Sequence, residues 1–217
     1  MYSLSEENYL KAIYHLEQLH KKEVSTNALA EKMDTKASSV TDMLKKMAEK
    51  NLVNYKKYQG VQLSSLGKET AINIVRKHRL WEVFLVEKLN FSWDEVHEVA
   101  EQLEHIQSKK LTAELDKFLG FPKRDPHGDP IPDAQGKITL AKKKLLFDLV
   151  PSEEGVCVGV KDSTKEFLQY LDKHAISLGV KIEIIEKEAF DQSMLVKIEG
   201  TIKRITSSIS KNLYISY

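Results

Sequence analysis

The chain has 217 residues, enough for two or three small units, and its 33 basic and 32 acidic residues leave a formal net charge of +1, so no general affinity for polyanions follows from the net charge, although a local basic patch is still possible. The single cysteine, Cys157, lies among apolar residues and excludes both an internal disulfide and a zinc site built from several cysteines. No apolar run approaches membrane-spanning length and the N-terminus has no signal-peptide core, which predicts a cytoplasmic protein without membrane association.

Residues 1–72 alternate helical patterns with short turns and end in a hairpin pattern. A first helix should have Ser5 as its N-cap, and a short second helix should be capped by Ser25 or Thr26. A tight turn leads into a third helix with an apolar stripe of Val40, Met43, Leu44 and Met47. Two β-prone runs then flank Gln59-Gly60. A helix-turn-helix followed by a hairpin is a winged helix, so residues 1–72 are predicted to bind DNA.

Basic and small hydroxyl residues gather on the expected recognition helix and wing. Seven lysines lie between residues 32 and 57 against three acidic residues, where DNA phosphates would lie. Hydroxyl groups in the first half of the helix could contact phosphates or base edges, whereas Asp42 could accept from a cytosine amine or point aside. The alternative is a winged helix that contacts only proteins. The predicted DNA-contacting residues are Lys36, Ser38, Ser39, Thr41, Asp42, Lys45, Lys46, Lys56 and Lys57.

Residues 73–140 form a second segment that is mainly helical. One long amphipathic helix is expected to start near residue 66, and another should start at the N-cap Ser92, break near Ser108 and stop at Gly120. Helices of this length beside a winged helix leave an apolar face uncovered, which predicts a homodimer. The Pro- and Gly-rich residues that follow, 121–137, should form a loop.

Potential metal ligands lie at helical spacing in this second segment. His97, Glu101, Glu104 and His105 would form one stripe at i, i+4, i+7 and i+8. The preceding helix carries His78 and Glu82 one turn apart, and antiparallel packing would bring this pair opposite His97. The ordinary alternatives are a solvated charged face for the stripe and a surface histidine for His78.

From residue 143 to residue 217 the pattern changes to short strands around one helical stretch. The strands are too few for a sandwich, so we predict a small SH3-like β-barrel. The expected fold class is therefore mainly α with β, comprising an N-terminal winged helix-turn-helix, a helical dimerisation and metal-binding domain, and a C-terminal SH3-like domain.

Several stretches resemble the metal-dependent repressors typified by the diphtheria toxin repressor and the manganese transport regulator. They are "SEENYLKAIYHLEQ", "VSTNALAEKMDTKASSVTDMLKKMAEKNLVNYKKYQGVQLSSLG", "RKHRLWEVFL", "VHEVAEQLEHIQS" and "DPHGDPIP". The resemblance covers residues 5–135, and its motifs match in order and spacing. The tail from residue 143 is similar to the SH3-like domain that longer members carry, on weaker marks such as "LFDLVPSEEGVCVGV".

The resemblance implies two metal sites near the junction of the first two segments. The regulatory site would use Glu101, Glu104 and His105, completed from the first helix by Asn8. The other would use His78, Glu82 and His97, with Glu166 or, as the weaker match, Asp162 from the SH3-like domain.

Departures from the family pattern bear on which metal is used. Where this chain has Asn8, members carry Met or Asp, and the manganese branch has Glu in place of Lys11, so a closely coupled two-metal cluster is not expected here. The iron branch has Cys in place of Glu101, whereas His97 is a feature of that branch. Because a carboxylate favours hard, oxygen-rich coordination, we expect Mn²⁺ as corepressor, with Fe²⁺ as the alternative.

The expected function is that of a homodimeric, metal-dependent repressor on a double-stranded, palindromic operator. Metal would hold two recognition helices at the spacing of successive major grooves. A metal-dependent hydrolase is the competing enzyme hypothesis, but no nucleophile or oxyanion motif accompanies the cluster, so no catalytic residue is predicted. A metal-buffering protein without DNA binding is the third hypothesis, and the lysine-bearing wing argues against it.

Overall fold

The computed structural model describes residues 2–20, 23–57, 59–140 and 142–216. Its contacts divide the chain into two compact units. The first comprises Met1–His78, Glu101–Ala113 and Pro132–Lys137, and the second comprises Arg79–Ala100, Glu114–Ile131 and Ile138–Tyr217. No helix among the described residues is long and apolar enough to cross a bilayer.

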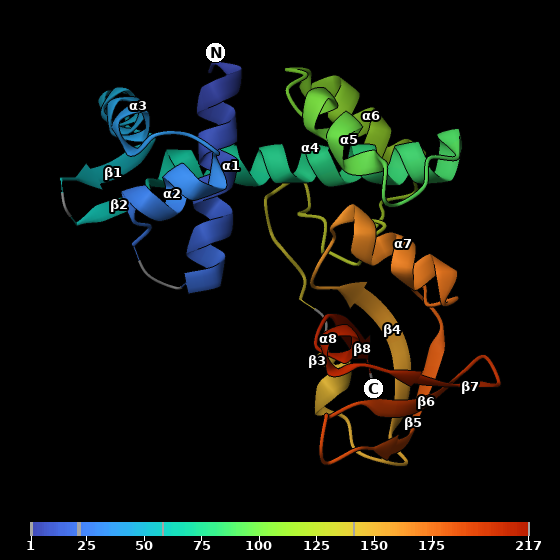
Figure 1. Cartoon of the computed structure of the whole chain (residues 1–217). Helices are drawn as coiled ribbons and strands as arrows, with labels where there is room; N and C mark the ends of the chain where they lie inside the picture. Colours follow the sequence, from blue (N-terminus) through green and yellow to red (C-terminus); the bar gives the residue numbers. More distant parts are fainter. Residues whose placement is uncertain (1, 21–22, 58, 141, 217) are drawn as a thin grey trace. The chain divides into compact units, whose positions relative to one another are not determined.

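The first unit contains the winged helix that the sequence predicts (Figure 1). Its elements are α1 (Leu4–His20), α2 (Thr26–Lys32), α3 (Ala37–Glu49), β1 (Val53–Lys56) and β2 (Gly60–Leu63). The antiparallel pair β1–β2 forms the wing, and Val24 extends it by exchanging two backbone hydrogen bonds with Val61, at 3.0 and 2.9 Å. Leu10, Ile13, Leu29 and Leu44 are fully buried, so one apolar face of α1 belongs to the core of this domain.

Helix caps in this domain agree in part with the sequence. The predicted cap Ser25 is confirmed, because its side chain accepts a hydrogen bond from the Ala28 amide at 3.1 Å. The predicted cap Ser5 is wrong. The first helix begins at Leu4, and Ser3 caps it: the Glu6 amide donates to Ser3 Oγ at 3.3 Å while the Ser3 amide donates to Glu6 Oε2 at 2.9 Å. This reciprocal pair is a capping box, and it fixes the start of α1.

Three further helices follow, namely α4 (Ser65–Leu89), α5 (Val96–Leu103) and α6 (Lys109–Phe118). The predicted interruption near Ser108 is confirmed, since residues 104–108 separate α5 from α6. The predicted N-cap Ser92 is wrong, because a turn at 93–95 precedes α5 and delays its start to Val96. The expected stop at Gly120 is confirmed by its φ of +73° directly after α6.

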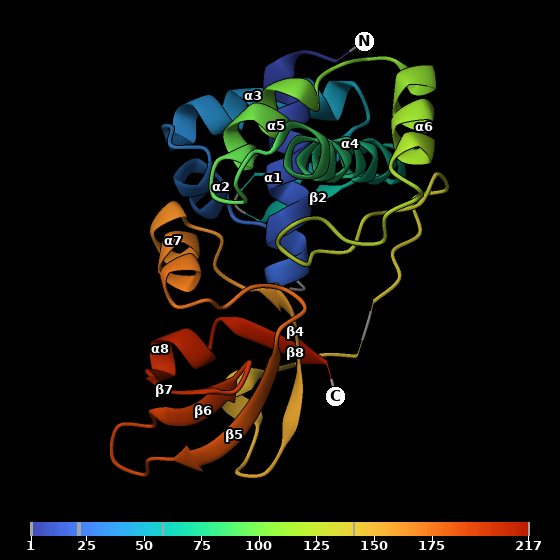
Figure 2. The same ribbon diagram turned by 90° about the vertical axis from the view of Figure 1, so that its right-hand side faces the viewer.

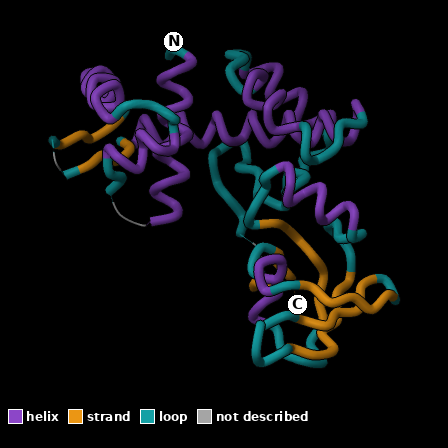
Figure 3. Tube along the Cα trace, in the orientation of Figure 1, coloured by secondary structure: helices purple, strands orange, loops and turns teal. Residues whose placement is uncertain are grey.

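The second unit contains a six-stranded antiparallel sheet, which Figures 2 and 3 show to be strongly curved. The strand order is β3-β8-β4-β5-β6-β7. The strands are β3 (Lys144–Leu145), β4 (Glu154–Val160), β5 (Lys181–Lys187), β6 (Met194–Ile198), β7 (Thr201–Ile205) and β8 (Leu213–Ser216). The helices η1 (Leu146–Asp148), α7 (Lys165–Lys173) and α8 (Ser207–Ser210) accompany them. Register shifts in the β4–β8 and β5–β6 pairs bend the sheet toward a small barrel.

The Pro-rich loop after α6 lies against strand β4 within the second unit. The Val160 amide donates to the carbonyl of His127 at 2.9 Å. Gly128 has a φ of +88°, and a Cβ at this position would lie 2.1 Å from the Val158 carbonyl oxygen. A side chain is therefore excluded here by both backbone conformation and space.

We expect Gly128→Ala to destabilise the protein more than Gly179→Ala. Both glycines have a φ of +88°, but nothing lies within 4 Å of a Cβ at Gly179. Gly179→Ala should therefore cost only the backbone strain of about 1 kcal/mol, whereas Gly128→Ala adds a backbone clash of roughly 2 kcal/mol or more. Urea unfolding followed by circular dichroism measures the difference. Equal shifts of the two midpoints would show that the loop does not pack closely on β4.

Candidate metal centre and nucleic-acid interface

The predicted stripe of ligands does not lie on one continuous helix. His97 and Glu101 are on α5, but this helix ends at Leu103, and Glu104 and His105 lie in the turn that follows. The Ile106 amide bonds to the Leu103 carbonyl at 3.1 Å, a three-residue turn that ends the α-helical ladder. The consequence is that Glu104 points into the first unit, where its side chain is fully buried.

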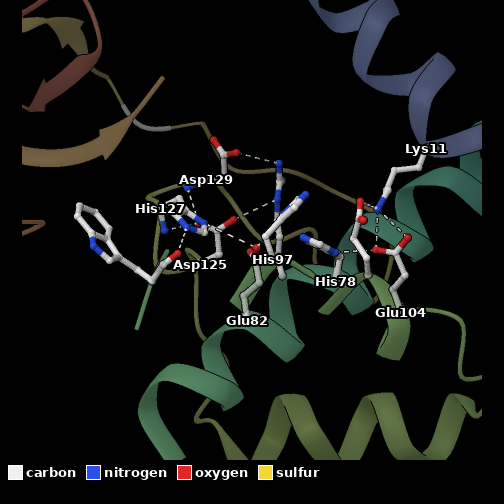
Figure 4. Close-up of polar contacts among 11 residues, drawn as sticks. Lys11, His78, Glu82, His97, Glu104, Asp125, His127 and Asp129 are labelled. Atoms are coloured by element: carbon white, nitrogen blue, oxygen red, sulfur yellow. Dashed lines mark hydrogen bonds and ion pairs between the residues drawn. The ribbon is translucent and has the colours of Figure 1, made fainter. Parts of the chain in front are cut away.

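Two cationic or hydrogen-bonding groups hold the buried Glu104 carboxylate (Figure 4). Lys11 Nζ lies 2.7 Å from Oε1 and 2.8 Å from Oε2, and His78 Nδ1 donates to Oε2 at 2.6 Å. Burial by itself raises the pKa of Glu104, but the hydrogen bond from His78 and the charge of Lys11 outweigh burial and lower that pKa. The carboxylate is thus kept ionised in a buried place, as a metal ligand must be.

A second polar contact joins α1 to the same turn. His105 Nδ1 lies 2.6 Å from Glu7 Oε2, and the Gln107 amide donates to Glu7 Oε1. Among the described residues, Glu7 and Lys11 make the contacts from α1 to this turn. The predicted ligand Asn8 follows Glu7 in the sequence and is half-buried, and its ligation stays a prediction. Glu7 was not predicted as a ligand from the sequence, although it stands next to Asn8 at the start of the helix.

The donor set of this regulatory cluster fits a divalent cation. Carboxylate oxygens and imidazole nitrogens are the groups that Mn²⁺ and Fe²⁺ bind, and no thiolate is present because Cys157 lies buried in the second unit. Glu104 Oε1 is buried and accepts no hydrogen bond of normal geometry among the described residues; it lies 2.7 Å from Lys11 Nζ and 3.9 Å from His105 Nε2. The predicted regulatory residues, together with Glu7, are called the regulatory cluster: Glu7, Asn8, Glu101, Glu104 and His105.

A second cluster lies in the second unit, also drawn in Figure 4. Glu82, Asp125 and His127 are all buried, and one donor atom from each lies within 4.8 Å of the others. His97, which is exposed on α5, joins them with its Nδ1 3.5 Å from Glu82 Oε1. Of these residues, Glu82 and His97 were predicted from the sequence. Asp125 and His127 were not predicted, because they lie in the segment interpreted as a loop.

The loop residues of this cluster are oriented by specific contacts. His127 Nε2 lies 2.7 Å from the carbonyl of Trp93, and its ring stacks on that indole, which leaves Nδ1 facing Glu82 at 3.7 Å. Burial disfavours a charged His127, but the hydrogen bond and charge of Glu82 outweigh it and raise its pKa. Burial, with the charges of Glu82 and Asp129, raises the pKa of Asp125 to about 7 against the opposing effect of Arg79.

The remaining predicted ligands of the second site are His78, Glu166 and Asp162. His78 is on α4 one turn before Glu82, and its described partner is Glu104 of the first unit. Glu166 is exposed in the first turn of α7, and Asp162 accepts a hydrogen bond from the Thr164 amide. Helix α7 contacts the residues before α5 through two hydrogen bonds. Gln169 Nε2 donates to Asp94 Oδ2 at 2.9 Å, and Trp93 Nε1 donates to Asp172 Oδ2 at 2.9 Å. Ligation by Glu166 stays a prediction.

The predicted nucleic-acid interface is solvent-accessible. All its members are exposed except the half-buried Thr41, whose hydroxyl donates to the Ala37 carbonyl at 2.9 Å. Asp42 forms an ion pair with Lys45 at 3.3 Å, so part of the Lys45 charge is compensated locally. An open hollow of about 390 Å³ lies between α2, α3 and the wing, lined in part by Thr41, Tyr55 and Lys57. These features suit a surface that receives a polar, negatively charged partner.

A winged helix with a basic exposed face, on a chain that also carries two carboxylate–imidazole clusters, defines the class of metal-responsive DNA-binding proteins. Three family models match the chain. They are the N-terminal DNA-binding domain of iron-dependent repressors over residues 1–61, the metal-binding and dimerisation domain of the same repressors over residues 64–133, and the FeoA domain over residues 144–217.

Individual relatives agree with these models. The iron-dependent repressor IdeR of Mycobacterium leprae (strain TN) is 30% identical over 172 residues, covering 76% of this chain and 74% of that protein. The structure of a manganese-dependent transcriptional repressor in complex with manganese is 34% identical with a TM-score of 0.84, covering 97% of this chain and 98% of that one. The structure of the manganese regulator SloR is also 34% identical, with a TM-score of 0.73 and 97% of each chain covered.

The chain belongs to the diphtheria toxin repressor family of metal-dependent transcriptional repressors. The resemblance identified in the sequence is thereby confirmed, as are the predicted fold class and the function of metal-dependent repression. The matched domains bind DNA and metal and dimerise, which agrees with the expected partners, DNA and a second copy of the chain.

Replacing Lys56 and Lys57 together by alanine should weaken binding about equally on specific and random DNA. Both side chains are exposed on the wing, where they would neutralise phosphates. The slope of log affinity against log salt should flatten by up to about two units. Fluorescence anisotropy across a salt series measures it, with the exposed pair Lys109 and Lys110 of α6, replaced likewise, as the matched control. An unchanged salt slope in the Lys56 and Lys57 variant would show that the wing does not contact DNA phosphates.

Proposed function

We propose that this repressor responds to Mn²⁺, with Fe²⁺ as the alternative corepressor. The observation that carries the proposal is the buried, ionised Glu104 carboxylate, surrounded by the oxygen and nitrogen donors of Glu7, Glu101 and His105. Hard carboxylate ligands without a thiolate favour Mn²⁺. Relatives named for manganese and for iron both match the chain, so the choice between the two metals rests on this donor set.

The regulatory site is proposed to comprise Glu101, Glu104, His105 and Asn8, with Glu7 as an addition from the structure. A divalent cation bound there would draw the negative groups of α1 and of residues 101–105 together. The contact between Glu7 and His105 already joins these two segments. The hydrogen bond that His78 donates to Glu104 favours the ionised form of that carboxylate. Because the same α1 packs in the winged-helix core, a ligand that favours this contact favours one placement of the DNA-binding domain.

The second site is proposed to comprise Glu82, Asp125 and His127, with His97 at its exposed side. All three buried groups offer oxygen or nitrogen donors, and the Trp93 carbonyl fixes the His127 ring so that Nδ1 faces Glu82. An orienting partner on the other ring nitrogen is the usual arrangement for a ligating histidine. His78 and Glu166 remain further candidates from the family resemblance.

We further propose that the homodimer binds a palindromic operator in the cytoplasm, where a chromosomal regulator acts. A two-fold symmetric protein presents two recognition helices to two half-sites. We assign it no enzymatic activity. Within each cluster, acidic and imidazole groups contact one another in buried surroundings. This arrangement supports a metal ion that holds segments together rather than one that catalyses hydrolysis.

The test is metal-dependent DNA binding by Glu104→Ala. Operator DNA selected from a random pool in the presence of Mn²⁺ is titrated anaerobically with wild-type protein and increasing Mn²⁺ or Fe²⁺. Wild type should gain at least about tenfold in DNA affinity, a typical coupling between two ligands. Glu104→Ala should lose this gain while still dimerising, because it removes the central buried carboxylate.

Glu98→Ala is the control, since Glu98 is an exposed glutamate on α5. It should retain the wild-type metal response. Retained activation in Glu104→Ala would contradict the site assignment, and activation by Fe²⁺ at far lower concentration than Mn²⁺ would select the iron alternative.

A further inference from the structure

A lysine contacts two carboxylates of the regulatory cluster. Lys11 Nζ lies 2.7 and 2.8 Å from the two oxygens of Glu104 and 3.2 Å from Glu101 Oε1. The side chain is only 14% exposed, so its ammonium is drawn into the cluster rather than into solvent. Figure 4 shows it reaching from α1 to the carboxylates. One positive group therefore bridges two of the acidic residues assigned to the metal.

The contacts of Lys11 join segments that are far apart in the chain. Glu101 and Glu104 are 90 and 93 residues away from it in sequence. A neighbouring cation, Lys77, bonds to the Ile106 carbonyl at 3.4 Å, and its pKa is lowered by burial against the attraction of Glu7 and Glu104. Lys11 therefore contacts the carboxylates of both Glu101 and Glu104, and it links α1 to the end of α5.

We propose that Lys11 is a tethered cation that takes the place of a metal ion between Glu101 and Glu104. This inference rests on the proposed function of the regulatory site. The ammonium holds α1 to the turn after α5 when no metal is bound, and it competes with an incoming dication for the same carboxylate oxygens. The chain therefore keeps part of the contact between α1 and the turn after α5 when no metal is bound. It also binds its activating ion more weakly than the same carboxylates would without the lysine.

Electrostatics sets the direction of both effects. A buried carboxylate that loses a close cation is destabilised, and a dication then gains the share of the attraction that the ammonium used to take. Removing the Lys11 charge should therefore raise Mn²⁺ affinity and loosen the metal-free contact of α1. Keeping the charge, as in Lys11→Arg, should do neither.

The experiment is calorimetric titration of the full-length chain with Mn²⁺, together with metal-free DNA binding. The binding phase that is lost in Glu104→Ala defines the regulatory site. In Lys11→Met that phase should tighten about tenfold or more, and metal-free affinity for operator DNA should fall. Lys11→Arg should stay close to wild type. Lys50→Met is the matched control, because Lys50 also pairs with a buried α1 carboxylate, that of Glu6, outside the cluster.

An unchanged or weakened Mn²⁺ phase in Lys11→Met, with native circular dichroism, would overturn the inference and leave the proposed function standing. A wild-type Mn²⁺ phase that survives in Glu104→Ala would overturn both. Should Lys11→Met unfold without metal, Lys11→Gln is titrated in its place, since its amide can still donate to one carboxylate. For that variant too, a tighter Mn²⁺ phase supports the inference and an unchanged one contradicts it.

Discussion

The buried negative charge of Glu104 is the constraint on which the regulatory part of this structure depends. A carboxylate withdrawn from water costs several kcal/mol unless cations and hydrogen bonds replace the lost hydration. Lys11 of α1 and His78 of α4 supply that replacement. The turn after α5 can therefore keep its native place only if α1 and α4 are also in theirs, and any cation that binds Glu104 acts on all three segments together.

This constraint reaches the DNA-binding surface through the two faces of α1. One face carries Leu10 and Ile13, which are fully buried in the winged-helix core. Glu7 and Lys11 reach instead to residues 101–107. A helix that is packed on one side and ion-paired on the other moves with its domain, so the polar contacts bear on the placement of the recognition helix α3. We propose these contacts of α1 as the route by which metal binding acts on DNA binding in this chain.

The sequence predicted what periodicity and spacing determine. Alternation of helical and β-prone runs identified the winged helix and the sheet of the second unit, and the metal-ligand types in order along the chain identified the family. The cap at Ser3 was missed because Ser5 also precedes a helical pattern, and only the reciprocal bond with Glu6 distinguishes the two. The end of α5 at Leu103 was missed because the helical periodicity continues into the turn.

Contacts between distant segments account for the rest. Nothing in the local pattern around Glu7 indicates that it meets His105, and nothing around His127 indicates that Trp93 orients its ring toward Glu82. Lys11 was visible as a departure from the manganese branch, but its ion pair with Glu104 follows only from the packing of α1 beside the end of α5. Ligand sets built from several elements are determined by tertiary packing, which one sequence does not reveal.

The central claim is that cation binding at Glu104 fastens α1 to residues 104–107. Hydrogen–deuterium exchange of the full-length chain, with and without Mn²⁺, tests it most directly because amide protection reports local opening. We expect Mn²⁺ to slow exchange in α1 and in residues 104–107 together, and Glu104→Ala to show no such slowing. Protection that rises in residues 104–107 while α1 exchanges as before, or that persists in Glu104→Ala, would contradict the claim.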